Sequence, residues 1–180
     1  MPRLRSTALV GIGAVLAFCA GASGLGEQPT EYQVKAAYLY NFAKFVEWPT
    51  PADAGKQFQI AVLGHDPFGP LLDETVEGKT VRGRAVAVRR VSSAAEARTC
   101  DELFLGAAEA RRLPEVLQAL RGRSVLIIGE SRDFVLEGGM IGLVNEDNKV
   151  RFEVNMTAAE KARLKVSSQL LRLARRVAKN

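Results

Sequence analysis

The hydrophobic pattern between Thr30 and Pro49 predicts one long helix. Thr30 followed by Gln33 is typical of a capping box, and Trp48 before Pro49 predicts the end, because a residue preceding proline is disfavoured in a helix. Apolar positions recur along one helical face at Tyr32, Ala36, Leu39, Ala43 and Val46, and along another at Val34, Tyr38, Phe42 and Phe45. Because two faces are apolar, we expect either the fold or a partner chain to cover the helix on more than one side.

Four short apolar runs after this helix predict β-strands. They read "FQIAVLG", "RAVAVRRV", "ELFLG" and "SVLIIGE". A helix is expected at "PFGPLLDET" after the first run, and another at "GAAEARRLPEVLQALRG", broken or started at Pro114, between the third and fourth. Strands that alternate with helices favour a parallel sheet covered on both faces.

The last third of the chain follows a different pattern. The runs "MIGLVN" and "KVRFEVN", separated by "EDN", predict an antiparallel hairpin. A helix, a break near residues 164–166 and a second helix capped by Ser167 should follow, and the buried face of this second helix should consist of Leu170, Leu171, Ala174 and Val177. The fold class is therefore α/β, with a mostly parallel sheet, helices on both faces, a C-terminal antiparallel hairpin and a long N-terminal helix.

The glycine-rich stretch "DFVLEGGMIGLV" at residues 133–144 could be a phosphate-binding loop. Such a loop runs from strand to glycines to helix, so that the helix N-terminus meets the anion. Here the order is reversed: residues 131–139 predict a short helix capped by Ser131 or Asp133 and stopped by Gly138 and Gly139, with a strand after it. Gly142 should mark a bulge or a close backbone approach in that strand, so the glycines have a structural explanation.

The N-terminus is typical of a secretory signal peptide. Arg3 and Arg5 precede an uncharged apolar run and a small-residue site ending at Ala22, which predicts a signal at residues 1–22 and a single domain at residues 23–180. A retained membrane anchor is the alternative, but the run is shorter than the roughly 18 residues a spanning helix needs. A lipoprotein acylated at Cys19 is another, although Phe18 replaces the expected small residue. We therefore expect a soluble exported protein.

Charge and composition exclude several function classes. The full chain has a formal net charge of +5, and two of its arginines lie in the predicted signal. Basic clusters at "VRGRAVAVRR" and "RLARRVAK" have no aromatic residues between them, so we expect no nucleic-acid partner; an exposed basic face could instead rest on anionic lipid.

The chain contains few residues of the types that commonly act in catalysis or bind metal ions. His65 is the only histidine and Cys100 the only cysteine after the predicted signal, which excludes His-cluster and zinc-thiolate sites; we expect no cofactor and no metal. Cys100 should be buried at the start of a strand. Gly64, His65, Asp66, Glu130, Ser131 and Arg132 follow two predicted parallel strands. They could converge on one crevice, with Arg132 as partner for an anion, or simply cap helices in polar loops. A hydrolytic or ligand-binding domain using His65 and Arg132 is the rival to a protein that acts through its surface.

Several segments together resemble the YfiR family of periplasmic proteins. They are "YQVKAAYLYNFAKFVEWP", "IAVLGHDPFG", "CDELFLG", "FVLEGGMIGLV" and "VRFEVNMTAAEKARLKVSSQLLRLARRV". The resemblance runs from about Glu31 to Val177. It implies a non-enzymatic, dimeric periplasmic repressor that binds the sensor region of an inner-membrane diguanylate cyclase and so lowers cyclic di-GMP and biofilm formation. A ligand-binding sensor domain for another receptor, such as a histidine kinase, is the alternative.

The resemblance also implies site residues and one departure. A small ligand would contact Glu153, Lys161 and Lys165, where the two lysines either suit an anionic group or form a solvated pair. Independently of the resemblance, Tyr38, Phe42, Phe45 and Trp48 are candidate aromatic anchors for a partner interface, with core packing as the alternative. Redox-sensing members have further cysteines, one of which faces the equivalent of Cys100 from the first strand. The matching position here is Ala61, so control by a disulfide is not expected.

Overall fold

The computed structural model describes residues 29–49 and 57–179. The predicted signal peptide, residues 1–22, lies outside these residues. The helices are α1 (Glu31–Phe45), α2 (Leu71–Val76), η1 (Glu96–Thr99), η2 (Ala107–Arg112), α3 (Leu113–Ala119), α4 (Met156–Lys161) and α5 (Ser168–Leu173), where η marks 3₁₀ geometry. The strands are β1 (Val46–Glu47), β2 (Phe58–Leu63), β3 (Thr80–Val81), β4 (Arg84–Val91), β5 (Glu102–Leu105), β6 (Leu126–Gly129), β7 (Ile141–Glu146), β8 (Lys149–Asn155), β9 (Lys165–Val166) and β10 (Arg176–Ala178).

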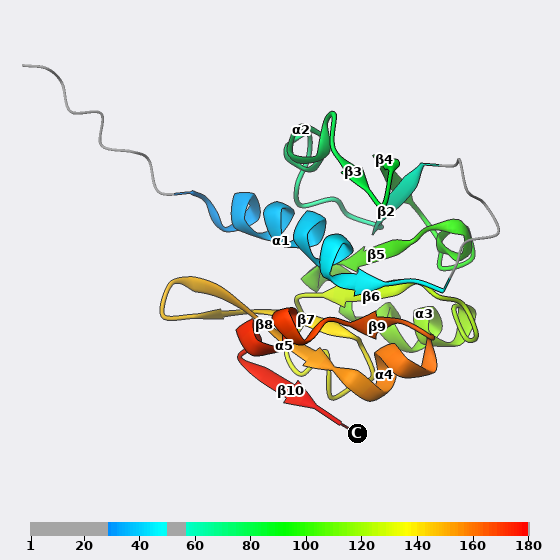
Figure 1. Ribbon diagram of the computed structural model, residues 1–180, viewed down its shortest axis with the longest axis vertical. Helices are drawn as coiled ribbons and strands as arrows, with labels where there is room; N and C mark the ends of the chain where they lie inside the picture. The colour runs from blue at the N-terminus through cyan, green and yellow to red at the C-terminus, as the bar shows by residue number, and fades with distance from the viewer. Residues whose placement is uncertain (1–28, 50–56, 180) are drawn as a thin grey trace, which may run out of the picture.

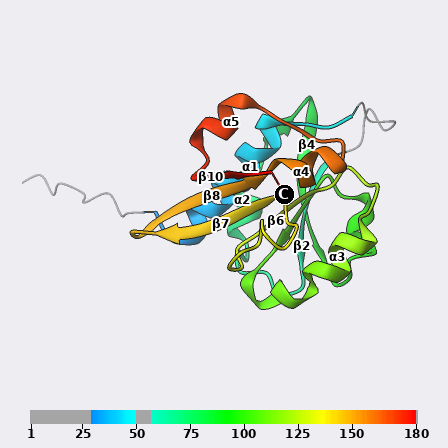
Figure 2. The ribbon, with the colours of Figure 1, turned by 90° about the horizontal axis from the view of Figure 1, so that it is seen from below.

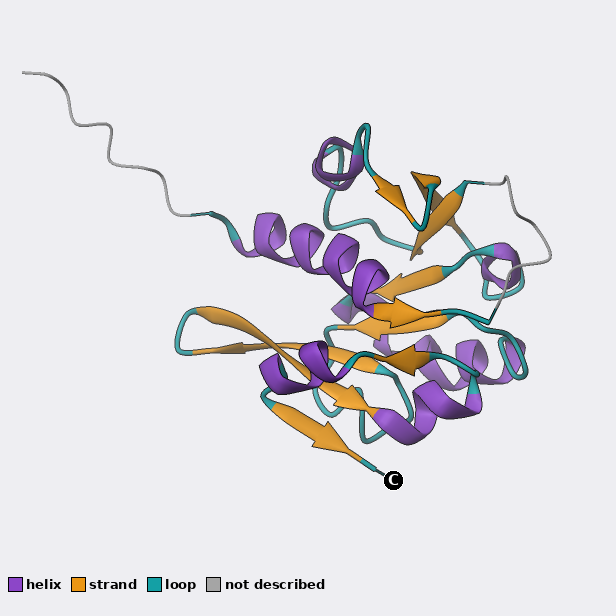
Figure 3. Cartoon of the chain, in the orientation of Figure 1, coloured by secondary structure: helices purple, strands orange, loops and turns teal. Residues whose placement is uncertain are grey.

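The main sheet has eight strands in the order β10-β8-β7-β6-β5-β2-β4-β3 (Figures 1 and 3). Strands β4, β2, β5, β6 and β7 are mutually parallel, whereas β8 is antiparallel to β7 and β3 is antiparallel to β4. The predicted fold class and the four predicted apolar strands are confirmed. A separate pair joins β1 to β9.

Helices cover both faces of this sheet, as Figure 2 shows for α1, α4 and α5 on one side and α3 on the other. Helix α1 contributes Leu39, Phe42 and Ala43 to the core, each fully buried. Phe42 meets Phe152 of β8 edge-on, with ring centroids 5.1 Å apart. The sheet supplies most of the remaining core, because all four residues of β5 and of β6 are buried.

Helix α1 starts as predicted but ends early. The capping box is present: Gln33 N donates to Thr30 Oγ1 over 3.3 Å, and Thr30 N donates to Gln33 Oε1 over 2.6 Å. The prediction that the helix continues to Trp48 is wrong, because Val46 and Glu47 leave it to pair with Val166 and Lys165 of β9. Tertiary strand pairing thus overrides the helical periodicity.

The helix predicted at residues 131–139 is also absent, and this segment crosses from β6 to β7 through turns alone. Asp133 has a φ of 60° and Gly138 a φ of 104°, and neither value is compatible with a right-handed helix. A regular helix could therefore form only between these two residues, which is too short a segment for the predicted one. A side chain on Gly129 or Gly139 would occupy the space of the Phe134 ring, and one on Gly142 would approach Val135 Cγ1 to 3.3 Å. The close approach predicted for Gly142 is confirmed, and the glycines make room for a buried aromatic ring.

The C-terminal segment largely follows its prediction. The β7–β8 hairpin turns at Asp147 and Asn148, both with positive φ, and Ser167 Oγ caps α5 by accepting from Leu170 N. The buried face predicted for this helix is wrong at Val177, which lies in β10 and is 41% exposed. Helix α5 ends at Leu173 because the chain there turns to pair with β8. Within residues 29–49 and 57–179, no helix has the length and apolar character needed to cross a membrane.

Candidate functional site

A polar groove lies where β5 and β6 end and α1 begins. Its volume is about 950 Å³. Parallel strands place their following loops at one edge of the sheet, where open α/β folds bind ligands. The lining residues are Glu31, Tyr32, Lys35, Ala107, Glu130, Ser131, Arg132, Asp133, Leu143, Val144, Asn145, Glu153, Arg175 and Arg176. We call this the polar groove.

A buried ion cluster forms one wall of the polar groove. The Lys35 ammonium, whose side chain is 5% exposed, forms salt bridges with Glu31 one turn earlier and with Glu130 after β6. Glu130 Oε1 also accepts hydrogen bonds from the Tyr32 hydroxyl at 3.3 Å and from Ala107 N at 3.0 Å. The cluster therefore fastens the first two turns of α1 to the ends of β5 and β6.

The cluster shifts three pKa values. Burial lowers the pKa of Lys35, but its hydrogen bonds to Glu130 and Glu31 outweigh burial, so the pKa lies above that of a free lysine. The hydrogen bond from Lys35 lowers the pKa of Glu31. Burial and the nearby Glu130 charge raise the pKa of Tyr32. Lys35 is thus a fixed cation with its charge already matched, which makes it a poor proton donor or nucleophile.

The opposite wall carries Glu153 of β8, which is 8% exposed. Arg175 Nη1 donates to its Oε1 over 3.0 Å, and Arg175 also forms a salt bridge with Glu146. Within the described part of the chain, Arg132, Arg176 and Asp133 line the groove without an ion-pair partner. The guanidinium groups of Arg132 and Arg176 are therefore the two cations of the groove that could bind an anion without breaking an existing ion pair.

The crevice predicted after the two strands forms only in part. Glu130, Ser131 and Arg132 lie in the polar groove with Glu153, but Gly64, His65 and Asp66 are not among its lining residues. His65 is exposed, and its backbone N–H donates to Glu109 Oε1 over 3.2 Å.

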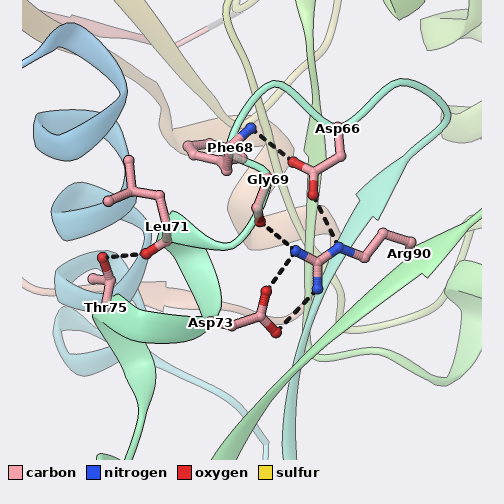
Figure 4. A network of polar contacts seen from close by, with 7 residues as sticks. All are labelled: Asp66, Phe68, Gly69, Leu71, Asp73, Thr75 and Arg90. Carbon is pink, nitrogen blue, oxygen red and sulfur yellow. Dashed lines mark hydrogen bonds and ion pairs between the residues drawn. The ribbon is translucent and has the colours of Figure 1, made fainter.

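Asp66 belongs to a network that fastens α2 to β4, drawn in Figure 4. Arg90 donates to Asp66 Oδ2 at 2.9 Å, to Gly69 O at 2.7 Å and to Asp73 Oδ1 at 3.0 Å. The other oxygen of Asp66 accepts from Phe68 N at 2.8 Å. With both carboxylate oxygens bound in this way, Asp66 is oriented by Arg90 and not by the adjacent imidazole.

The lysines implied by the family resemblance are not on one helical face. Lys161 is the last residue of α4, and Lys165 lies in β9, in register with Glu47. Lys161 borders a different cavity from the one that Glu153 lines. The helix break between the two lysines, expected near residue 164, is the reason.

The four aromatic side chains named for a partner interface differ in exposure. Phe42 is fully buried and therefore has no surface for a partner. Tyr38, Phe45 and Trp48 are half-buried. The Trp48 indole N–H donates to Asp101 O over 3.2 Å, and the Tyr38 hydroxyl donates to Val150 O over 3.4 Å. These three retain some surface, although each is fixed against the core.

Cys100 is buried, as predicted, and has no disulfide partner among the described residues. Burial raises the pKa of its thiol, an effect that nearby Arg89 opposes in part. Arg89 Nη1 lies 3.9 Å from Sγ, and Arg89 is in register with Ala61 of β2. Ala61, which matches the second cysteine of redox-sensing members, is in register with Leu103 of β5 and supplies only a methyl group there.

Sequence reasoning did not identify Lys35, Tyr32, Arg175 and Arg176 as groove residues. A signal for Lys35 existed, because it shares a helical face with Leu39 and Phe42, and a lysine in a buried stripe requires a partner. No such signal existed for the two arginines, whose position depends on the chain returning beside β8. The described residues contain no group of three His, Cys, Asp or Glu side chains suited to a metal ion.

Comparison with known structures supports the fold through one of the two matches described below, the Vibrio protein. A conserved domain protein from Vibrio cholerae O1 biovar El Tor aligns with a TM-score of 0.57 and 12% identity, over 83% of this chain and 60% of that one. The ABC domain from Streptococcus pneumoniae in complex with L-Trp aligns with a TM-score of 0.49 and 13% identity, over 67% of this chain and 55% of that one. This chain thus spans 60% of the first structure and 55% of the second. At 12% identity the likeness to the Vibrio protein concerns the fold alone.

Comparison with protein families reaches further, because one match extends from α1 to the end of α5. Residues 32–175 match the YfiR/HmsC-like family. This range includes all lining residues of the polar groove except Glu31 and Arg176, and also the Arg90 network and Cys100. The chain is a member of the YfiR/HmsC-like family.

Proposed function

We propose that this chain is a non-enzymatic periplasmic regulator that binds and represses the sensor region of an inner-membrane diguanylate cyclase. Repression would lower cyclic di-GMP and with it biofilm formation. The observation that carries the proposal is the match to the YfiR/HmsC-like family over residues 32–175. The predicted signal peptide supports the compartment, because a cyclase sensor region that faces the periplasm can be reached only by an exported protein.

The chemistry of the polar groove agrees with regulation better than with catalysis. Its buried charges are already bound to partners, because Lys35 contacts Glu31 and Glu130, and Glu153 contacts Arg175. A general base or nucleophile needs a free, poised group within reach of a substrate. Groups that are already paired hold structure or bind a ligand, and the groove has the dimensions of a small-molecule site.

The proposed interface with the receptor uses the half-buried aromatic side chains Tyr38, Phe45 and Trp48. Aromatic anchors fixed by packing lose little conformational entropy on binding and are enriched at the energetic centres of interfaces. To move a receptor from mostly active to mostly inactive, roughly 5.5 kcal/mol of differential binding is required. We include a homodimer in the proposal because the resemblance to the YfiR family implies a dimer.

A small anionic ligand is proposed to tune this repression through Arg132, Arg176 and Glu153. A ligand that binds only one of two states of the protein shifts their populations by its difference in affinity. Because Arg132 and Arg176 lack ion-pair partners among the described residues, an anion there would replace solvent and not an existing salt bridge.

A binding experiment tests the receptor. The mature chain carrying a C-terminal tag would be crosslinked in the envelope of its own cells, recovered, and its partners identified by mass spectrometry. We expect an inner-membrane diguanylate cyclase, and we expect its recovery to fall with Trp48→Ala. Recovery should be unchanged with Arg111→Ala, an exposed residue of η2 that serves as the control.

The second candidate function is a small-ligand sensor for a different receptor, such as a histidine kinase. The unpaired arginines of the polar groove favour ligand sensing in either case. The same crosslinking experiment separates the two candidates: a histidine kinase in place of a cyclase would favour the sensor and exclude the cyclase repressor.

A further inference from the structure

A second cavity lies at the opposite end of β6 from the polar groove. Its volume is about 410 Å³. Its walls come from the end of α3 and the loop after it, from β6, from the β6–β7 crossover and from α4. The apolar lining residues are Leu117, Leu120, Val125, Ile127, Leu136, Met140, Ala158 and Ala162. We call this the apolar hollow.

Polar contacts hold the walls of the apolar hollow in place, and one set is made by Asn155, which is itself a lining residue. The buried Asn155 side chain donates to Val135 O over 2.8 Å and accepts from Ala158 N over 3.0 Å, which joins the crossover to α4. Arg163 Nη2 donates to Gly122 O over 3.0 Å and fixes the end of α4 to the loop after α3. The hollow is therefore built by the fold and does not need a ligand to form.

The charges around the hollow are unbalanced. Arg121, Arg123 and Lys161 border it, and Glu137 is the one acid in its lining. All three cations are exposed, and within the described residues none forms a side-chain hydrogen bond or a salt bridge. These cations make no hydrogen bond or salt bridge within the described fold, and they lie next to apolar walls. Such a site is complementary to a molecule with an apolar body and a negatively charged end.

Leu136 adds an independent observation. It is 45% exposed although it lines the hollow, and it is one of three large apolar side chains with such exposure among the described residues. The neighbouring Phe134 and Val135 are buried against the sheet. An exposed leucine at the rim of an apolar cavity provides surface that a bound apolar chain would cover.

We propose that the apolar hollow binds an amphiphilic carboxylate of the fatty-acid type. Its hydrocarbon chain would contact Leu117, Leu136 and Ile127, and its carboxylate would be held by Arg121, Arg123 and Lys161. This site is separate from the polar groove, because Lys161, Arg121 and Arg123 do not line the groove.

Calorimetric titration of the purified mature chain tests the proposal. The probes are decanoate, 1-decanol with the same chain but no charge, and butyrate with the charge but a short chain. We expect saturable binding of decanoate at one site, with decanol and butyrate each at least tenfold weaker. The double variant Arg121→Ser/Arg123→Ser should weaken decanoate binding about tenfold, the loss expected for one charge-assisted contact.

Two controls make the result decisive. Arg111→Ser/Arg151→Ser removes the same charge from exposed positions outside the hollow and should leave decanoate binding unchanged. Leu136→Ser, at an exposed position that folding tolerates, should weaken decanoate but not butyrate. The proposal is overturned if decanoate does not bind, if its binding does not saturate, if decanol binds equally well, or if the two double variants behave alike.

Discussion

The ammonium group of Lys35 is bound to the carboxylate of Glu130, which lies 95 positions later in the chain, and both side chains are at most 6% exposed. This single contact connects the first helix to the end of a central strand. It also forms a wall of the polar groove, so the integrity of that groove and the stability of the fold depend on the same pair.

Replacing Lys35 with methionine should destabilise the protein strongly. The substitution leaves the Glu130 carboxylate buried with only the Tyr32 hydroxyl and Ala107 N as donors. We expect a loss of about 3–5 kcal/mol in the free energy of unfolding, measured by urea denaturation. Lys44→Met, on an exposed position of the same helix, is the matched control and should change stability by less than about 0.5 kcal/mol. The double variant Lys35→Met/Glu130→Met should recover most of the loss; if it does not, the pair is not the cause.

Glu102 should make the protein less stable as pH rises. Its carboxyl group is fully buried in β5 without a hydrogen-bond partner, and burial raises its pKa well above 4.5. A raised folded-state pKa stabilises the fold below the unfolded pKa, and the contribution is lost as pH increases, at ~1.4 kcal/mol per pH unit until the folded pKa is reached. Glu102→Leu should therefore be more stable than the parent at pH 7, by a margin that shrinks towards pH 4.5. Equal pH profiles for the two proteins would contradict this.

Adding a methyl group at Gly139 should strain the β6–β7 crossover. The new Cβ would occupy the space of the Phe134 ring. Overpacking of this kind costs about 1–3 kcal/mol, so Gly139→Ala should lower the melting temperature. Gly106→Ala is the matched control, because its nearest neighbour would be Glu130 Oε1 at 3.5 Å. A crossover that tolerates both substitutions equally would show that Phe134 is not fixed there.

Cys100 should react slowly with thiol reagents in the native state. The thiol is 6% exposed and burial raises its pKa, so little reactive thiolate reaches solvent. Labelling by a disulfide reagent should be complete in urea and at least tenfold slower without it. Rapid native labelling would reopen a redox role for this residue.

The sequence predicts β2, β5 and β6 well because these strands are almost entirely buried and read as continuous apolar runs. The failures occur where tertiary pairing decides local structure. Val46 follows the helical period of α1 but pairs with Val166, and Val177 follows the period of α5 but lies in an edge strand beside β8. Neither pairing leaves a local pattern, since both partners lie far apart in the chain.

The residues of the polar groove also fall into those that the sequence could predict and those that it could not. Glu130, Ser131 and Arg132 could be predicted because the ends of parallel strands meet at one edge of the sheet. Arg175 and Arg176 could not, because their approach to the groove depends on the position of β10 beside β8. His65 was expected in the groove for the same reason as Glu130, because it follows a parallel strand. Its backbone is instead bound by Glu109, and His65 does not line the groove.

The most direct test of the central proposal is the cyclic di-GMP content of the cells that make this protein. The gene would be deleted and restored either as the full chain or as a form lacking residues 1–22, which cannot be exported. We expect cyclic di-GMP to rise on deletion and to return to its original level only with the exported form. An unchanged level on deletion, or full restoration by the form that stays in the cytoplasm, would contradict it.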